Sequence, residues 1–305
     1  MILNYTVTYA DIGTRLNVLL KNKLNISTRL LLKLKNGKCI FVNNTITTTD
    51  YVVKENDYIT VNLNNIDITN DFKYPLYDKK LDILYEDEYL LIVNKEAFMP
   101  VHPCSNNKDT TLLNAIFNYY HKQNYINCNA HILTRLDSNT SGICIIAKNS
   151  YIQELFISKK DTLNLTKQYI AFTNNIIKKD HGYIVNNIQR NPNSIITRIV
   201  TNNFNIGKYA KTEYFVLERN VEKNYTKVKV ILHTGRTHQI RVHFASIGHV
   251  LLGDDLYADI YDKVYLNTCK ELINRHALHC SEVSFIHPIT NKKIQISCNF
   301  PNDLI

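Results

Sequence analysis

The chain has 305 residues, 45% of them hydrophobic and 21% charged, and is long enough for one large domain or two smaller ones. It contains no run of 18 apolar residues and no basic start followed by an apolar stretch, which excludes a membrane span and argues against a secretory signal. The 7 scattered cysteines include no C-x-x-C pair, so a disulfide framework or zinc ribbon is not expected and the cytoplasm is favoured, while the net charge of +9 favours nucleic acid as a partner.

The side-chain pattern of residues 1–62 indicates a compact basic module. Leucines recur at helical spacing within 14–24, and Ser27 is placed to cap a second helix over 28–36. Gly37 then follows where a left-handed helix end would place glycine. Two short strands are expected within 38–44 and 58–63.

The basic side chains of this module are candidates for contact with an RNA backbone. Two helices followed by strands could present a basic face to phosphates, although a solvated helix face in a lysine-rich chain explains the same pattern. The segment also resembles the small RNA-binding module named after a ribosomal small-subunit protein, here called S-four-like, at residues 15–17, 27–29, 36–38, 42–43 and 56–57. The candidates are Arg15, Arg29, Lys33, Lys35 and Lys38.

The segment 63–80 is polar, contains Pro75 and shows no period, so we interpret it as a linker. From residue 81 a new apolar pattern begins, and no second boundary is visible up to residue 305. One domain of catalytic size over 81–305 is therefore expected.

The first chemically informative stretch is HILTRLDSNTSGICIIAK at residues 131–148. It predicts a polar turn from Ser138 to Gly142 and then an apolar strand, with Asp137 at the edge of the turn. Arg135 lies two positions before Asp137, so the two would share a face of an extended chain. An aspartate beside a guanidinium stays ionised, which suits a nucleophile, but a structural Arg–Asp pair fits equally.

The second stretch is TGRTHQIRVHFASIGHVLLGDDLY at residues 234–257. We expect a strand at IRVHF and turns at Gly248 and Gly253. Arg236 and Arg241 could serve a carboxylate and a phosphate. Four histidines (233, 238, 243 and 249) raise the possibility of a metal site, but their spacings of five, five and six do not fit a ligand set, and hydrogen-bonding or core roles are expected instead.

These two stretches resemble the signature segments of RluA-type RNA pseudouridine synthases, HRLDxxTSGxxxxAK and TGRTHQIRVHxxxxGHPxxGDxxY. Further similar segments follow the family order over 81–305, among them residues 85–88, 101–103, 111–115, 167–169, 207–212, 276–279 and 287–288. The sequence departs from the family pattern at Thr134 (usually His), at Glu96 and Phe98 (usually Pro and Gly) and at Val250 (usually Pro). These departures bear on substrate choice more than on activity.

The resemblance implies an α+β fold: an extended, mixed and mostly antiparallel sheet with flanking helices, a cleft across its middle and a small α/β S-four-like domain ahead of it. It implies Asp137 as the nucleophile, Arg241 as its partner and Tyr169 stacked on the uracil with a part in removing the C5 proton. Leu278 would line the pocket, Arg135 would contact the RNA near a flipped nucleotide, and Arg236 and His238 would bind substrate. No cofactor or metal is implied.

The expected activity is isomerisation of uridine to pseudouridine in structured RNA, with large-subunit (23S) ribosomal RNA as the expected target and tRNA as an alternative. The protein is expected to act as a monomer. A non-catalytic RNA-binding or ribosome-assembly factor is the competing hypothesis, and a metal-dependent hydrolase built on the histidines is a third.

Overall fold

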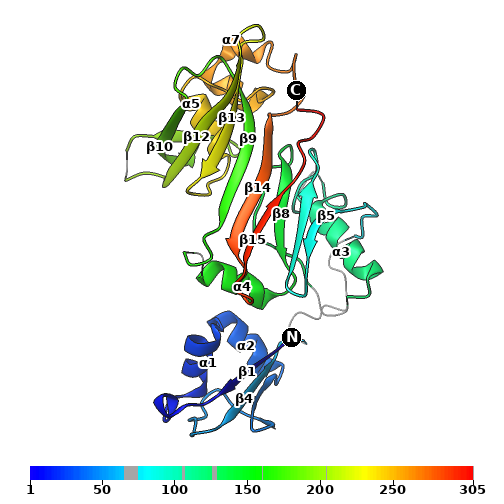
Figure 1. Ribbon diagram of the computed structural model, residues 1–305, viewed down its shortest axis with the longest axis vertical. Coiled ribbons are helices and arrows are strands. Elements are labelled where there is room, and N and C mark those ends of the chain that lie inside the picture. Colours follow the sequence, from blue (N-terminus) through cyan, green and yellow to red (C-terminus); the bar gives the residue numbers. More distant parts are fainter. Residues whose placement is uncertain (65–74, 105–106, 126–128, 160, 204, 305) are drawn as a thin grey trace.

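The structure is a computed structural model that describes residues 1–64, 75–104, 107–125, 129–159, 161–203 and 205–304. Its strands form two separate sheets (Figure 1). A four-stranded sheet uses residues 2–62, and an eleven-stranded sheet uses residues 82–297. The second sheet is mixed and mostly antiparallel, as expected.

The small sheet has the order β1-β4-β2-β3 and is packed with two helices and one turn of 3-10 helix. Its elements are β1 (Ile2–Thr6), η1 (Tyr9–Asp11), α1 (Leu16–Leu24), α2 (Thr28–Asn36), β2 (Ile40–Val42), β3 (Thr45–Ile46) and β4 (Tyr58–Asn62). Leucines at helical spacing, such as Leu16 and Leu20, are fully buried. The Ser27 side chain accepts a hydrogen bond from the Leu30 N–H, which confirms the predicted helix cap.

The end of α2 differs from the prediction. Gly37 has a φ of −79° and is right-handed, whereas the next residue, Lys38, has a φ of 52°. The chain therefore reverses one residue later than expected. At Gly37 an added Cβ would lie 3.0 Å from the Cys39 sulfur, so close packing, not a left-handed backbone, limits the size of this side chain.

The small sheet and its helices contact the larger part through the α1–α2 turn. Tyr151 of α4 (Ser150–Ser158) donates its hydroxyl to the Leu24 carbonyl at 2.9 Å, and the Ser27 hydroxyl donates to Glu154 at 2.5 Å. Most of the predicted linker, residues 65–74, lies outside the described residues. The division at 62 and 81 remains a prediction.

The large sheet has the order β11-β10-β12-β13-β9-β14-β8-β6-β5, with β15 beside β14 and β7 beside β8. Every pair is antiparallel except β14 with β8. The strands are β5 (Asp82–Glu86), β6 (Leu90–Lys95), β7 (His131–Ile132), β8 (Ser141–Ala147), β9 (Thr166–Asn174), β10 (His181–Arg190), β11 (Arg198–Thr201), β12 (Lys208–Asn220), β13 (Tyr225–Leu232), β14 (Leu278–Ile286) and β15 (Lys293–Ser297).

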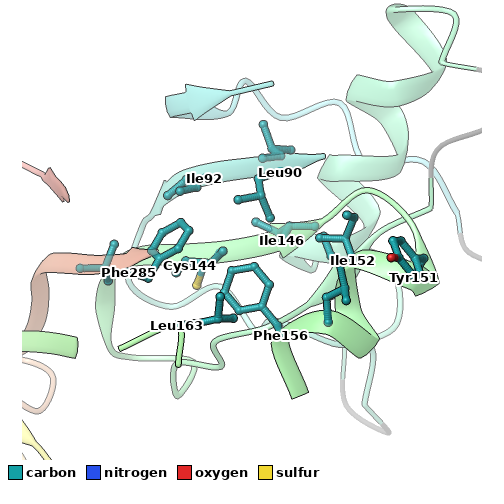
Figure 2. Packing of buried hydrophobic residues seen from close by; sticks show 14 of the residues in the cluster. Leu90, Ile92, Cys144, Ile146, Tyr151, Ile152, Phe156, Leu163 and Phe285 are labelled. Carbon is teal, nitrogen blue, oxygen red and sulfur yellow. The ribbon is translucent and has the colours of Figure 1, made fainter. Parts of the chain in front are cut away.

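The helices beside this sheet are α3 (Leu112–Lys122), α4, α5 (Gln239–Ser246), α6 (Asp255–Tyr261) and α7 (Lys263–Leu266). Figure 2 shows the core where α4 meets the sheet: Ile152 and Phe156 of the helix pack against Ile146 and Phe285 of the strands. Within the described ranges, no helix has the length and apolar character needed to cross a membrane.

The prediction of a strand at IRVHF is wrong, because these residues belong to helix α5. The apparent alternation misled because every residue from Gln239 to Ala245 is buried. An element enclosed on all sides carries no period that separates helix from strand. Phe244 packs against Tyr214 of β12, so tertiary contacts hold the helix against the sheet.

The single parallel pair determines where the site can form. Because β8 and β14 run in the same direction, with Ser141 opposite His279, the segments that precede both strands lie at the same end of the sheet. Gly142 has a φ of 112°, and an added Cβ would lie 2.3 Å from the Cys280 carbonyl oxygen, so only glycine allows this close pairing. Residues 137–140 and 275–277 are thereby brought side by side.

We expect Phe98→Gly to stabilise the protein by about 1 kcal/mol, since left-handed backbone costs a residue with a Cβ roughly that much. Phe98 has a φ of 63° and the residue is 59% exposed, so the ring contributes little packing to offset the strain. Urea denaturation measures the free energy of unfolding. Phe98→Ala, which removes the ring but keeps the Cβ, is the control, and equal stability of the two variants would contradict the strain argument.

Candidate active site

A cleft of about 620 Å³ opens at the end of the sheet where β8, β9, β13 and β14 meet. Its walls include Asp137 from the turn before β8, Tyr169 from β9, Leu232 from β13 and Leu278 from β14. Arg241 of α5 completes the wall behind Asp137. The predicted catalytic residues, separated by up to 104 positions in the sequence, therefore converge on one cleft.

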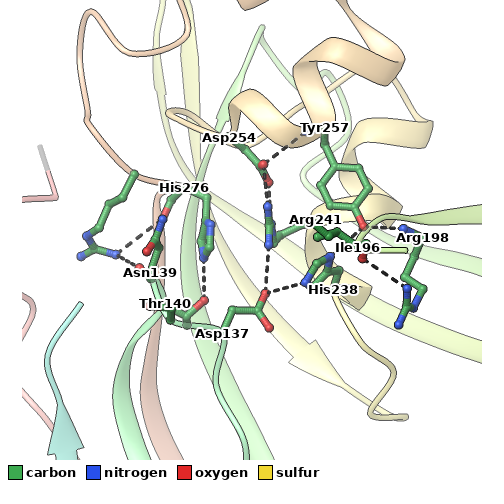
Figure 3. A network of polar contacts seen from close by, with 12 residues as sticks. Asp137, Asn139, Thr140, Ile196, Arg198, His238, Arg241, Asp254, Tyr257 and His276 are labelled. Atoms are coloured by element: carbon green, nitrogen blue, oxygen red, sulfur yellow. Dashed lines mark hydrogen bonds and ion pairs between the residues drawn. The ribbon is translucent and has the colours of Figure 1, made fainter. Parts of the chain in front are cut away.

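Asp137 is hydrogen-bonded by Arg241, which also binds a second carboxylate, that of Asp254 (Figure 3). Arg241 donates from Nη1 to Asp137 Oδ2 at 3.1 Å, and from Nε and Nη2 to the two oxygens of Asp254 at 2.7 and 2.8 Å. Asp254 is buried, whereas the Asp137 side chain keeps 30% of its surface exposed toward the cleft. The Arg241 guanidinium thus fixes the orientation of Asp137 and leaves its carboxylate accessible.

The charge on Arg241 is maintained although the side chain is buried. Burial acts to lower its pKa, but the hydrogen bonds and charge of Asp254, and then the charge of Asp137, outweigh this and raise the pKa above its usual value. The guanidinium also lies 5.0 Å from the centre of the Tyr257 ring. A permanently charged, planar group therefore faces the cleft carboxylate.

His238 is the second neighbour of Asp137, with Nε2 at 3.7 Å from Oδ2. Its other ring nitrogen is 3.0 Å from the Tyr257 hydroxyl, which in turn accepts the Arg198 backbone N–H. Burial lowers the pKa of His238 against the opposing effect of Asp137, which keeps the ring neutral at pH 7. His238 also has a φ of 57°, a strained conformation for a residue with a side chain, and it immediately precedes α5.

Tyr169 and Leu278 form the apolar side of the cleft. Tyr169 is 4% exposed, and burial, followed by the effect of Cys280, raises the pKa of its phenol well above the usual value. The phenol is therefore protonated at neutral pH. Leu278 lies one strand away, beside β9. An aromatic face and an aliphatic side chain in one pocket suit a flat, uncharged base.

The two predicted RNA contacts Arg135 and Arg236 both line the cleft. Arg236 is exposed, and its Nε donates to the Tyr209 carbonyl at 2.9 Å. Arg135 is close enough to His102 that its charge adds to burial in lowering the pKa of that histidine. The cleft therefore carries two arginine side chains, which are groups suited to bind phosphate.

Residues 89–246 match the family model described as RNA pseudouridylate synthase. The chain belongs to this family. It is 33% identical over 284 residues to YjbO, an uncharacterized RNA pseudouridine synthase of Bacillus subtilis, covering 92% of this chain and 94% of that one.

Other relatives carry more specific names. The chain is 38% identical over 234 residues to ribosomal large subunit pseudouridine synthase D of Buchnera aphidicola subsp. Schizaphis graminum (73% of this chain, 71% of that one) and 31% identical over 247 residues to the protein of the same name in Escherichia coli (79% and 73%). Human RNA pseudouridylate synthase domain containing 1 shares the fold, with a TM-score of 0.59, 23% identity and coverage of 74% and 86%. This chain is an RNA pseudouridine synthase of the RluA type.

In this pseudouridine synthase the turn that carries Asp137 is held from behind by three buried groups. Lys95 donates to the Ser138 carbonyl at 2.9 Å, Arg275 donates to the Asn139 carbonyl at 2.9 Å, and His276 is hydrogen-bonded to the Thr140 hydroxyl at 2.7 Å. Arg275 is itself bound by both oxygens of Asp303 near the chain end. Sequence reasoning missed Lys95 and Arg275, although Arg275 is one of only nine arginines.

Thr134, which departs from the family pattern, has a structural role. Its side chain is buried, and its hydroxyl accepts a hydrogen bond from the Ile145 N–H at 2.8 Å. The substitution therefore removes a histidine from the segment before Asp137 and ties that segment to β8. Val250, the other buried departure, is fully enclosed.

The five basic candidates of residues 1–62 do not contribute to the cleft. All five are exposed on the small module, with Arg29, Lys33 and Lys35 on α2, Lys38 just after it and Arg15 at the start of α1. Arg29 and Lys33 are one helical turn apart and share a face. This surface is separate from the cleft.

The histidines considered for a metal site have other partners. His238 is hydrogen-bonded to the Tyr257 hydroxyl, His243 to the Thr212 hydroxyl at 2.9 Å, and His249 to the Asn174 carbonyl at 3.2 Å. His233 meets Glu213 at 2.8 Å. Among the residues that the structure describes, no three His, Cys, Asp or Glu side chains gather as a metal ion would require.

The sequence did not assign a partner to Asp254, which directly follows the turn expected at Gly253. Its signal was available, because an acidic residue within the second signature stretch must be neutralised if it is buried. Tyr257 and Arg198 were also missed as supports of His238. Their contacts join residues 59 positions apart, which no local spacing reveals.

Proposed function

We propose that this enzyme isomerises uridine to pseudouridine in structured large-subunit ribosomal RNA, with Asp137 as the nucleophile. The observation that best supports this proposal is the position of the Asp137 carboxylate. Arg241 orients it, and it is open to a cleft that Tyr169 also lines. The relatives named ribosomal large subunit pseudouridine synthase D support the choice of RNA, and tRNA is the alternative.

In the proposed reaction the bond between N1 of uracil and C1′ of ribose breaks and a bond from C5 to C1′ forms. The proton on C5 is lost, and N1 gains one, so no oxidant or reductant is needed. Asp137 attacks either C1′ or the base, and the detached uracil turns while it remains in the pocket. The Arg241 guanidinium stays fixed beside the carboxylate throughout, so little reorganisation is required as charge develops.

Tyr169 stacks on the uracil and takes part in removing the C5 proton. Because burial holds the pKa of its phenol well above the usual value, Tyr169 meets the base protonated. It can accept the C5 proton only as it passes its own to a second group. Leu278 lines the apolar side of the pocket, and Arg135 and Arg236 hold the flanking phosphates after the nucleotide has left its stack.

The competing role, a non-catalytic RNA-binding or assembly factor, does not require an accessible carboxylate with a fixed orientation. Burial of the Arg241–Asp254 ion pair carries a desolvation cost, and a role in orienting the partly exposed Asp137 explains why the pair is present. The experiment that tests the proposed substrate is a map of pseudouridines in total RNA from cells with and without the protein. A site lost from large-subunit ribosomal RNA supports the proposal, and a site lost only from tRNA contradicts it.

We also propose that the module of residues 1–62 contacts RNA phosphates through its exposed basic side chains. Replacing Arg29 and Lys35 by Gln is expected to reduce the slope of log affinity against log salt by about 1.5, since each phosphate contact contributes 0.7–0.9. Deleting residues 1–62 should weaken binding to long RNA and flatten the slope further. The measurement is a salt titration with a labelled RNA hairpin.

The matched control for this prediction is Lys223→Gln with Lys263→Gln, which removes the same charge from exposed positions outside the module. If both double variants change the slope equally, the effect comes from net charge and the module has no specific contact with RNA.

A further inference from the structure

The large sheet has a second surface that the reaction does not use. In β12 and β13, Thr212, Tyr214 and Val230 point to the side covered by α5, where Tyr214 meets Phe244. Because neighbouring residues of a strand point to opposite faces, Lys211, Glu213 and Phe215 point to the other side. Figure 1 shows β10, β12, β13 and β9 side by side in the upper half of the molecule.

Six side chains on this side surround Glu213, and we call them the outer-face patch: His181, Tyr183, Lys211, Phe215, Lys229 and His233. They belong to three neighbouring strands and the residue after β13, and the register places Tyr183 beside Glu213 and His181 beside Phe215. Tyr183 is 51% exposed. His181 and His233 are exposed as well, whereas Lys211, Phe215 and Lys229 are half-buried, so the patch is partly open to solvent.

Aromatic rings and lysines alternate within the patch. The Lys211 ammonium lies 4.6 Å from the centre of the Tyr183 ring, and the Lys229 ammonium lies 4.7 Å from the Phe215 ring. His181 stacks on Phe215 with the ring centres 4.4 Å apart. Flat rings with cations beside them are the groups that bind unpaired bases and the phosphates between them.

The acid at the centre of the patch is ionised and is hydrogen-bonded by three neighbours. Glu213 receives hydrogen bonds from the Tyr183 hydroxyl, His181 and His233 at 2.9, 2.9 and 2.8 Å. Burial would raise the pKa of Glu213, but these three partners outweigh it and lower the pKa to about 2. The patch therefore holds one carboxylate whose oxygens are engaged by these donors, and the two lysine ammonium groups are the charges of the patch that attract a phosphate.

The patch is continuous with the rim of the catalytic cleft. Lys211 donates its N–H to the Thr234 hydroxyl, and its carbonyl accepts the His233 N–H. The chain then runs from His233 through Thr234 to Gly235 and Arg236, which line the cleft. Only Thr234 and Gly235 separate His233 of the patch from Arg236 at the cleft. An RNA strand that leaves the cleft past Arg236 would therefore come close to the patch.

We propose that the outer-face patch binds an unpaired segment of the substrate RNA that flanks the modified uridine. A base stacks on the exposed Tyr183 ring, Phe215 supports His181 from below, and Lys211 and Lys229 contact the phosphates beside that base. The inference rests on RNA as the substrate, which the family membership provides, and it does not depend on which residue is the nucleophile. The patch would then extend recognition beyond the cleft.

The test measures binding of a fluorescein-labelled, unstructured 15-nucleotide RNA to the full-length protein in an Asp137→Asn background. Lys211→Ala with Lys229→Ala is expected to weaken binding about tenfold. Tyr183→Leu, which keeps apolar bulk but removes the ring, is expected to weaken it about fivefold, whereas Tyr183→Phe retains binding. The charge-matched control is Lys292→Ala with Lys293→Ala, two exposed lysines outside the patch.

A second readout is cross-linking of the same RNA carrying 4-thiouridine, with adducts expected on peptides from β10 or β12. If the patch double variant and the control bind within twofold of each other and no adduct falls on these strands, the patch does not bind RNA. Turnover of the unaltered enzyme is measured separately. If the unaltered enzyme does not turn over but RNA binding still depends on the patch, the proposed function is wrong and this inference stands. If turnover is normal but RNA binding does not depend on the patch, this inference is wrong and the proposed function stands.

Discussion

Replacing Asp137 by Asn is expected to stop the release of tritium from RNA that carries 5-tritiated uridine, lowering turnover by roughly four orders of magnitude or more. The amide has nearly the same shape as the carboxylate and can still accept a hydrogen bond from Arg241 through its oxygen. The change therefore removes the nucleophile and little else. Single-turnover assays at saturating enzyme measure it without interference from product release.

The reason for so large an effect is that the remaining groups of the cleft cannot replace a carboxylate. His238 is neutral because burial lowers its pKa, and Tyr169 is a protonated phenol. Asp254 is buried and already holds two donors of Arg241. Among the described groups of the site, Asp137 alone combines a carboxylate with access to the cleft.

RNA affinity separates this prediction from a failure to fold. Asp137→Asn should bind RNA within a few-fold of the unaltered protein, and Asp259→Asn on the exposed side of α6 should leave both binding and turnover unchanged. Tritium release by Asp137→Asn at the normal rate would contradict the nucleophile assignment. Absence of release from the unaltered protein with every RNA tested would favour the non-catalytic role.

Part of the site could be predicted because Asp137, His238 and Arg241 fall in two ordered signature segments. Scarce residue types are a further signal: in a chain with only 8 Gly, Gly142 and Gly253 lie in these segments, and both have positive φ angles. At Gly253 an added Cβ would come within 2.1 Å of the Arg275 carbonyl oxygen. These glycines mark places where two segments approach too closely for any side chain.

The supports of the site could not be predicted, because they depend on contacts that the topology creates. Arg275 reaches the Asn139 carbonyl across 136 residues only because β8 and β14 are parallel neighbours. Local patterns report which face of an element is buried, but they do not report which two strands pair. The same limit explains α5, whose burial on all sides removed the periodicity that would have shown a helix.

The small module was easier to predict than the large sheet, for the same reason. Its helices are amphipathic, and the Ser27 cap and the leucine spacing are local signals that tertiary contacts leave intact. Two features differed: strands β1 and β3 lie outside the segments where strands were expected, and Lys38 and not Gly37 takes the left-handed conformation at the end of α2. The tolerance of a lysine at that position shows that a positive φ alone does not require glycine.

Arg241→Lys is expected to lower kcat about 100-fold and to leave RNA affinity nearly unchanged, because the loss concerns the orientation of Asp137 and not the charge in the cleft. Arg241 uses three nitrogens: Nη1 binds Asp137, while Nε and Nη2 bind Asp254. A single ammonium at the end of a flexible chain cannot hold both carboxylates in these directions. Lysine would therefore stay with one of them and leave the other free to rotate.

The control for this prediction is Arg236→Lys on the rim, where the arginine is exposed and its Nε reaches one carbonyl. That change should alter kcat less than threefold. Because Arg241 and Asp254 are buried, urea denaturation of each variant is needed to show that Arg241→Lys remains folded at the assay temperature. If folded Arg241→Lys keeps the normal kcat, positive charge alone suffices beside Asp137, and the planar fork serves only to neutralise Asp254.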